Sequence, residues 1–312
     1  MQRRMLERVS AVALALLFAA GCGQARAGRP LSVGPEAGLP RSASSHVVVM
    51  VMENAEASDV LANPSARYTT ALLRRSGLAT QSYAITHPSL PNYLALTSGS
   101  TDGVSSDCVT CHVEARNIVD QLEAKGISWK AYLEDEPRGC FRGAAAAGYA
   151  KKHNPFIYYD DIALSPHRCR RLVGFAQLAA DLRRGRLPSY AWISPNLCDD
   201  GHDCGIAGAD RFLSHTVPPL LRELGPHGFL VLTWDEGRTS RGCCGGLARG
   251  GRIATIVIGP DVRGGAREGR PVDHYGTLAT IEEALGLPLL AGAGDPRSGR
   301  LNGLFTRPPR IR

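Results

Sequence analysis

Apolar runs recur along the chain, and several of them are rich in β-branched residues. They occupy positions 46–52, 189–194, 229–234 and 253–258, and shorter runs of the same kind occupy 81–86 and 127–132. A continuous apolar run of this length is typical of a strand that is buried on both faces, as in the interior of a parallel sheet. These six segments are therefore predicted to be strands of one sheet.

Segments with helical spacing separate the predicted strands. Helices are expected at 65–76, 92–97, 118–125, 174–184, 211–224 and 277–285, whereas 139–158 has no regular pattern. Strands that alternate with helices form parallel sheets with crossover connections. The pattern predicts an α/β fold, with a central, mostly parallel sheet flanked by helices on both faces.

Acidic and amide side chains follow two of the predicted strands. Glu53 and Asn54 end the first strand, and Asp235 and Glu236 end the strand at 229–234. The carboxyl ends of parallel strands share one edge of a sheet, where open α/β folds bind their ligands. The two pairs are candidate metal or phosphate ligands. The alternative for Glu53-Asn54 is a polar strand exit that begins a turn.

Ser89 lies between two prolines, just before a predicted helix. Pro91 suits the first turn of that helix. A helix N-terminus stabilises an alkoxide and presents free N–H groups to an anion, which a nucleophile that attacks phosphorus requires. The alternative is that Ser89 only caps the helix.

Three histidine-bearing segments are further candidates. Asp199, Asp200, His202 and Asp203 lie between Cys198 and Cys204, and they are either ligands of a divalent ion or a solvated turn. His274 precedes a predicted helix as a cap, an exposed residue or a nitrogen ligand. His153, in the irregular segment, is either a phosphate contact or a surface residue.

The N-terminus has the pattern of an export signal. Residues 1–8 are basic, and the apolar run at 11–20 is too short for a permanent membrane span. Residues 18–22 look like a bacterial lipobox with Cys22 as the lipidated residue, and 25–27 offer an ordinary cleavage site instead. We expect a signal peptide at 1–22, a linker at 23–45, one domain at 46–306 and a basic tail at 307–312, with membrane attachment only if Cys22 is acylated.

Eight further cysteines indicate disulfides, because an even number in an exported chain is typical of an oxidising compartment. The Cys108-x-x-Cys111 spacing also occurs in zinc and redox motifs, but no second such pair is present. Spacing does not determine connectivity. Pairing neighbours in the sequence gives, as a hypothesis, these bonds: Cys108–Cys111, Cys140–Cys169, Cys198–Cys204 and the adjacent Cys243–Cys244.

The composition limits the classes of binding partner that we expect for this protein. The chain has 312 residues, of which 44% are hydrophobic, and a net charge of +7. The excess arginine is scattered, and no basic helix with interleaved aromatic residues indicates nucleic-acid binding. A positive field favours the collection of phosphorylated substrates.

Five segments in this order resemble a known family, the bacterial and fungal phosphoesterases of the alkaline-phosphatase superfamily. This family includes secreted acid phosphatases and phospholipases C that act on phosphatidylinositol or phosphatidylcholine. The resemblance runs from about His46 to Gly294. It rests on the segments at 52–54, 87–93, 194–198, 233–237 and 273–275.

The resemblance implies an alkaline-phosphatase-like fold and one or two divalent metal ions. The first metal site would comprise Glu53, Asn54, Ser89, Asp235 and Glu236, with Ser89 as ligand and nucleophile. Candidates for a second site are Asp200, His202 and His274. Asn92 and the adjacent helix N-terminus would hold phosphoryl oxygens, and the further contacts or proton donors would come from His87, His153, His202 and Arg252.

The expected function is that of an exported, metal-dependent phosphomonoesterase of acid-phosphatase type, with a phosphoseryl intermediate. A phospholipase C or another phosphodiesterase is the alternative, because the same nucleophile and metals serve both reactions. A lipoprotein that binds phosphate or metal without turnover is the alternative from another class. The expected substrate is a phosphorylated small molecule or a phospholipid head group, and the protein is expected to be a monomer.

Overall fold

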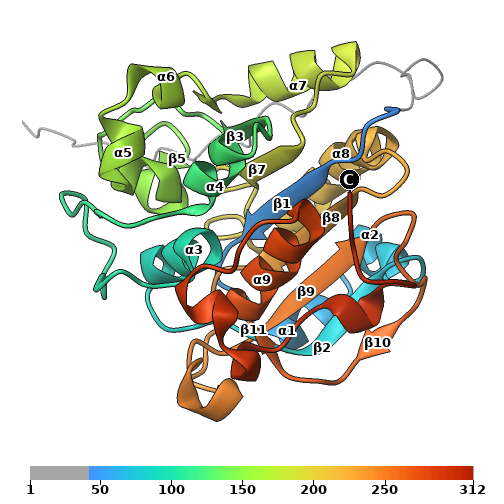
Figure 1. The fold of residues 1–312 in the computed structure, drawn as a ribbon. Coiled ribbons are helices and arrows are strands. Elements are labelled where there is room, and N and C mark those ends of the chain that lie inside the picture. Colours follow the sequence, from blue (N-terminus) through green and yellow to red (C-terminus); the bar gives the residue numbers. More distant parts are fainter. Residues whose placement is uncertain (1–41, 312) are drawn as a thin grey trace, which may run out of the picture.

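A nine-stranded sheet runs through the centre of the structure, a computed structural model that describes residues 42–311 (Figure 1). The expected signal peptide, Cys22 and residues 23–41 of the expected linker lie outside the described residues. The main path of the sheet is β10-β2-β9-β8-β1-β7-β3-β6, and β11 also pairs with β2. The strands of this sheet are β1 (Val47–Met52), β2 (Gly77–Tyr83), β3 (Trp129–Leu133), β6 (Leu172–Val173), β7 (Tyr190–Ser194), β8 (Phe229–Trp234), β9 (Arg252–Ile258), β10 (Arg267–Glu268) and β11 (Val272–Asp273).

The sheet is mostly parallel, as expected from the strand pattern. β1 lies between β7 and β8 and is parallel to both, and β3 is parallel to β7. The strand expected at 253–258 is β9, which runs antiparallel to β8 and to β2. Its first residue, Arg252, therefore lies at the edge where its neighbours end.

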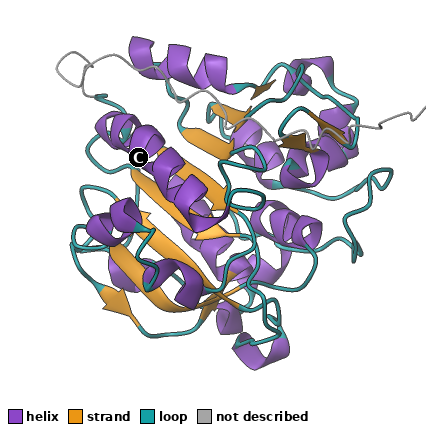
Figure 2. Ribbon diagram, turned by 180° about the vertical axis from the view of Figure 1, so that it is seen from behind, coloured by secondary structure: helices purple, strands orange, loops and turns teal. Residues whose placement is uncertain are grey.

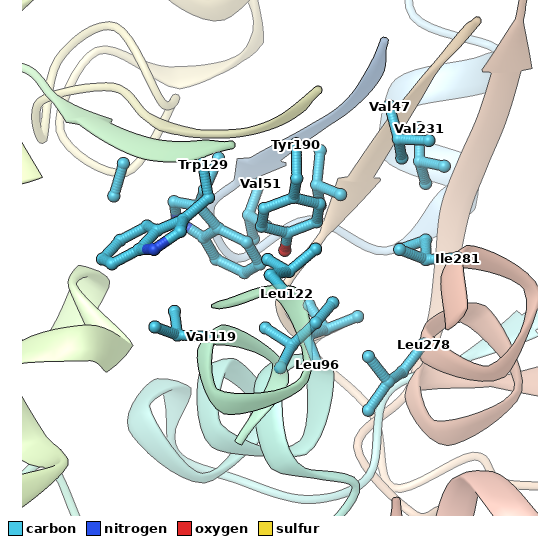
Figure 3. Packing of buried hydrophobic residues seen from close by; sticks show 14 of the residues in the cluster. Val47, Val51, Leu96, Val119, Leu122, Trp129, Tyr190, Val231, Leu278 and Ile281 are labelled. Carbon is cyan, nitrogen blue, oxygen red and sulfur yellow. The ribbon is translucent and has the colours of Figure 1, made fainter. Parts of the chain in front are cut away.

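Helices cover both faces of the sheet (Figures 1 and 2). Val47, Val49 and Val51 of β1 point into one core, and the intervening residues of β1 point into the other. The first core includes α3 (Ser89–Ser98), α4 (Ile118–Ala124) and α9 (His274–Leu285), and Figure 3 shows part of it. The second includes α2 (Arg67–Leu72), α7 (Phe175–Arg184) and α8 (Gly205–Glu223). Each fully buried aliphatic side chain contributes about 1.5–3 kcal/mol, so the continuous apolar runs are the main reason that β1 and β8 form the centre of the molecule.

Six helices of the described residues correspond to expected ones: α2 (Arg67–Leu72), α3 (Ser89–Ser98), α4 (Ile118–Ala124), α7 (Phe175–Arg184), α8 (Gly205–Glu223) and α9 (His274–Leu285). Three short helices were not expected: α1 (Ala57–Leu61), α5 (Asp160–Ala163) and α6 (Pro166–Cys169). α3 begins at Ser89 itself, three residues before the expected start. α2 ends four residues early, because the chain enters β2 at Gly77.

The segment expected to be irregular, 139–158, contains only short elements. They are the hairpin β4 (Ala145–Ala146) and β5 (Tyr149–Ala150) and the 3-10 turns η2 (Lys151–His153) and η3 (Pro155–Tyr158). Later 3-10 turns are η4 (Cys244–Gly246), η5 (Ala291–Gly294), η6 (Pro296–Ser298) and η7 (Asn302–Leu304). Although short, η2 reaches the carboxyl edge of the sheet and contributes to the site described below.

Four disulfides connect the loops with the pairing expected from neighbours in the sequence: Cys108–Cys111, Cys140–Cys169, Cys198–Cys204 and Cys243–Cys244. The end of the chain, expected to be a basic tail, packs on the domain, since Arg307 contacts Asp261 and Ile311 is buried. Within residues 42–311, no helix combines the length and the apolar character needed to cross a membrane.

Candidate active site

Ser89 is the first residue of α3 and is completely buried. Its Oγ lies 3.2 Å from Glu53 Oε2, 3.4 Å from Glu236 Oε1 and 3.5 Å from Asn54 Oδ1. A hydroxyl has one proton and therefore donates to one of these acceptors at a time. The remaining oxygens face the hydroxyl with free lone pairs, an arrangement that suits a cation.

The acceptors come from the ends of two paired strands. Met52 of β1 is in register with Trp234 of β8, which places Glu53 and Asn54 beside Asp235 and Glu236. The Asn54 backbone N–H donates to Asp235 Oδ1 at 3.0 Å, and the Asn54 side-chain amide donates to Glu236 Oε1 at 3.1 Å. Asn54 has a φ of 35°, a left-handed conformation that asparagine tolerates better than most residues. The structure thus brings together the five residues expected to form the first metal site.

A second cluster shares Glu53. His153 of η2 lies between two carboxylates, with Nε2 3.2 Å from Glu53 Oε2 and Nδ1 3.2 Å from Asp200 Oδ2. All three side chains are buried, and their ligand atoms lie within 4.8 Å of one another. Although burial acts to lower the pKa of His153, the Glu53 and Asp200 carboxylates raise it to about 10. The sequence offered His153 as a phosphate contact, a proton donor or a surface residue, and not as a partner of Glu53 and Asp200, because nothing in an irregular loop indicates which carboxylates it will meet.

Tyr93 is a site residue to which the sequence interpretation assigned no role. Its hydroxyl donates to Glu53 Oε1, and its ring stacks on His153 with 5.5 Å between ring centroids. Tyr93 follows Ser89 by four residues, so both lie on the same face of α3. The four-residue spacing is the sequence feature from which a position of Tyr93 beside Ser89 could have been predicted.

The electrostatics of the cluster match a divalent cation. Burial, with help from Glu53 and Glu236, raises the pKa of Asp235 well above its ordinary value, and burial raises that of Asp200 to about 6. Asp235 Oδ2 and Asp200 Oδ2 are buried without a hydrogen-bond partner. Several carboxylates, one amide and one imidazole are suitable ligands for a divalent ion, so the residues present fit the implied metal.

His87 lies at the outer side of the cluster, with its side chain 38% exposed. Nδ1 lies 2.5 Å from Glu236 Oε2, and Nε2 lies 3.1 Å from the Thr239 carbonyl oxygen. Both ring nitrogens therefore face acceptors, and the ring ties Glu236 to the loop after β8.

Two expected substrate contacts are engaged elsewhere. Asn92 accepts from the N–H groups of Ile85 and Thr86 and donates to the carbonyls of Thr86 and Pro88. Its amide braces the turn before Ser89 and has no group left for a phosphoryl oxygen, contrary to the expectation. Arg252 donates through Nη1 to the Thr80 carbonyl, on the β2 side of its strand.

The two histidines expected to complete a second metal site also differ from the expectation. His274 Nε2 donates to the Asp235 carbonyl oxygen at 2.6 Å, and burial lowers its pKa to about 4. His274 thus supports the Asp235 backbone with its neutral ring. His202 pairs with Asp203 at 2.7 Å, and its ring lies 6.3 Å from that of His153, at the rim of the cluster. In the described residues, the candidate ligand group around Asp200 contains His153 and neither of these two histidines.

Comparison with known proteins gives several related sequences. The chain is 33% identical to a probable acid phosphatase from Kluyveromyces lactis over 70% of its length and 53% of that protein. It is 31% identical to a phosphatidylinositol-3-phosphatase from Mycobacterium tuberculosis, over 81% of this chain and 82% of that protein. The chain spans about half the length of the fungal acid phosphatases that it matches.

Solved structures match the fold. A protein of the alkaline phosphatase superfamily from Vibrio parahaemolyticus superposes with a TM-score of 0.56 at 12% identity, over 84% of this chain and 71% of that one. Murine ectonucleotide pyrophosphatase/phosphodiesterase 5 gives a TM-score of 0.52 at 11% identity, over 79% and 96%. The model of the phosphoesterase family matches residues 49–288. The chain therefore belongs to the phosphoesterase family and has the fold of the alkaline-phosphatase superfamily.

Proposed function

We propose that this protein is a metal-dependent phosphomonoesterase in which Ser89 is the nucleophile. The observation that carries the proposal is the position of Ser89 Oγ, at the N-terminus of a ten-residue helix and within 3.5 Å of oxygens from Glu53, Asn54 and Glu236. A non-catalytic binding protein needs no hydroxyl at this point. The relatives named as acid phosphatases support the same reaction class.

Two sets of side chains are suited to hold divalent ions. In the first set, Glu53, Asn54 and Glu236 contact Ser89, and Asp235 accepts from the Asn54 backbone N–H. Asp200 with His153 forms a second set that shares Glu53. A divalent ion bound there lowers the pKa of the serine hydroxyl and neutralises charge on the phosphoryl oxygens.

The residues of the chain then have defined roles. Ser89 Oγ gives its proton to the adjacent Glu53 carboxylate and forms a bond to phosphorus, while the bond from phosphorus to the leaving-group oxygen breaks. His202, at the rim, is the proposed donor of the proton that the leaving group requires. Water then gives a proton to His202 and attacks the phosphoseryl group, and the proton on Glu53 returns to Ser89 Oγ as phosphate is released. His87 and Tyr93 hold the carboxylates of Glu236 and Glu53 in place.

Export is part of the proposal. Four disulfides in the described residues are typical of a protein that folds in an oxidising compartment, and the pattern of residues 1–22 is that of an export signal. The substrate is proposed to be a phosphorylated small molecule or a phospholipid head group. The relative named phosphatidylinositol-3-phosphatase supports the second of these.

The decisive experiment compares the wild type with Ser89→Ala on para-nitrophenyl phosphate and on bis-para-nitrophenyl phosphate. We expect the loss of the nucleophile to lower kcat by at least about 10³-fold, and chelation to remove wild-type activity until a divalent ion is restored. Ser98→Ala is the matched control, because Ser98 is buried in the same helix and bonds to Leu94 and Asp102. Undiminished turnover by Ser89→Ala would refute the assignment, and a preference for the diester would favour a phosphodiesterase.

A further inference from the structure

Asp107 lies against the helix that carries the nucleophile. Its Oδ1 accepts a hydrogen bond from the Leu90 backbone N–H at 2.9 Å, and its Oδ2 accepts from Lys152 Nζ at 3.0 Å. Leu90 is the residue directly after Ser89. One carboxylate therefore occupies two anion-binding donors, a helix N-terminal N–H and an ammonium, beside the serine.

The turn η2 connects this pair to the metal-ligand cluster. Lys151 Nζ donates to the Val109 carbonyl and lies 4.5 Å from the centroid of the Tyr158 ring. Lys152 holds Asp107, and the next residue, His153, contacts Glu53 and Asp200. Two consecutive lysines thus fasten the loop around the Cys108–Cys111 disulfide to the segment that enters the site.

The pair lies beside the residue that follows Ser89 and is itself in contact with solvent. Ser89 is 0% exposed, whereas the side chains of Asp107 and Lys152 are 28% and 24% exposed. Because Ser89 is buried, a substrate that reaches it must displace some of the groups around it. The Asp107–Lys152 pair is suited to be displaced, because a solvent-accessible ion pair contributes only about 0–1 kcal/mol to stability.

The chemistry of the pair matches a phosphoryl group. A phosphate monoester has unsubstituted oxygens that require hydrogen-bond donors when its phosphorus reaches Ser89. The Leu90 N–H is a single donor. It therefore does not form a full hydrogen bond to a carboxylate and to a phosphoryl oxygen at the same time.

We propose that Lys152 and the Leu90 N–H bind the phosphoryl oxygens of a phosphate monoester, and that Asp107 occupies both donors in the free protein and leaves them when the substrate enters. The inference rests on the proposed function and deepens it. It makes Asp107 an internal competitor of the substrate and Lys152 a substrate-binding residue that favours the doubly charged monoester over a singly charged diester.

The test is the affinity for inorganic phosphate, measured by calorimetry on the metal-loaded protein and as the competitive inhibition constant. Asp107→Asn keeps an acceptor for Leu90 but removes the competing charge, so we expect phosphate to bind about 3-fold to 10-fold more tightly and KM for para-nitrophenyl phosphate to fall in parallel. Lys152→Met should weaken phosphate binding by about 10-fold or more, with a larger loss of kcat/KM for the monoester than for the diester.

The controls lie outside the contacts of this pair. Lys125→Met removes an exposed lysine whose ammonium bonds to the Gly286 carbonyl, and Glu114→Gln removes an exposed acid that follows the Cys108–Cys111 disulfide. Both should leave the affinity for phosphate unchanged. Lys152→Arg, which keeps the charge, should recover most of the affinity, and thermal unfolding of every variant checks that the fold is retained.

Unchanged phosphate affinity in Lys152→Met overturns the proposal, and so does weaker binding in Asp107→Asn, which would show that Asp107 positions the lysine rather than competing with phosphate. Calorimetry requires no turnover. If Ser89→Ala remained active, the proposed nucleophile would fail while the phosphate affinities still decided this inference. If Ser89→Ala were inactive and the affinities did not change, the inference alone would fail.

Discussion

Glu53 is the residue on which both parts of the site converge. Its Oε2 faces Ser89 and His153, and its Oε1 accepts from the Tyr93 hydroxyl. A side chain shared in this way must be held in one orientation, since a small rotation would change its contacts with all three partners. Tyr93 is the residue that holds it.

Tyr93→Phe should therefore weaken metal binding while the nucleophile stays in place. Loss of a hydrogen bond that orients a ligand carboxylate costs about 10–100-fold in metal affinity or activity, so we expect a higher concentration of divalent ion for half-maximal activity. Tyr159→Phe removes another buried hydroxyl, which bonds to Thr97 away from the cluster, and serves as control. Identical metal titrations of the two variants would contradict the assigned role.

At the scale of elements, the loop that follows β8 depends on a single side chain that lies shortly after the end of β1. Glu56, the N-cap residue of α1, accepts hydrogen bonds from the backbone of Arg238, Thr239 and Arg252 and from the Thr239 hydroxyl. A Cβ on Gly237 would lie 2.4 Å from Glu56 Oε2, so the close approach requires glycine. The Thr239 carbonyl in turn contacts His87.

Glu56→Ala should loosen this loop and lower the free energy of unfolding. It leaves several backbone N–H groups without their acceptor, at a cost of about 1–3 kcal/mol for each group that stays buried. Urea unfolding measures the loss, and kcat should fall with it because His87 loses its support. Glu283→Ala, which removes a partly exposed ion pair with Arg300, is the control and should cost less than about 1 kcal/mol. Equal losses in the two variants would show that Glu56 does not organise the loop.

For the whole molecule, buried acids make stability depend on pH. Glu282 of α9 is buried, and its carboxylate accepts from the Leu290 N–H at 3.1 Å. Burial raises its pKa to about 8 from an ordinary value of 4.5. Between these two values the folded protein keeps a proton that the unfolded chain releases. The stability linked to this proton is complete below about pH 4.5 and is lost as the pH rises to about 8.

Glu282→Gln should remove this part of the pH dependence, since an amide does not titrate. Compared with the wild type, the variant should gain stability between pH 5 and pH 8 in urea unfolding. The oxygen of the new amide still accepts from Leu290, and its NH₂ group is able to donate to Gln121 Oε1, which has no partner. Glu283→Gln should show no such gain. A constant difference between wild type and Glu282→Gln across this range would be evidence against a buried protonated carboxyl.

The sequence by itself determined the central strands of the sheet and the acidic and amide residues at the ends of two of them. Apolar runs long enough to be buried on both faces require a layered α/β fold, and strands that end in Glu53-Asn54 and Asp235-Glu236 bring these residues to one edge. The prolines around Ser89 indicate that a helix starts nearby, and the structure places that start at Ser89 itself, three residues earlier than expected. These features depend on periodicity and on short-range geometry, which a single sequence contains.

Only the tertiary structure decided the rest. The reversed direction of β9, the approach of His153 to Glu53 and Asp200, and the contact of Asp107 with Leu90 and Lys152 join segments that are far apart in sequence. The same holds for Asn92 and His274, whose polar groups bond to backbone near the nucleophile and near Asp235. The physical reason is that a loop has no periodic pattern, so the partner of each polar side chain depends on how the layers of the fold pack together.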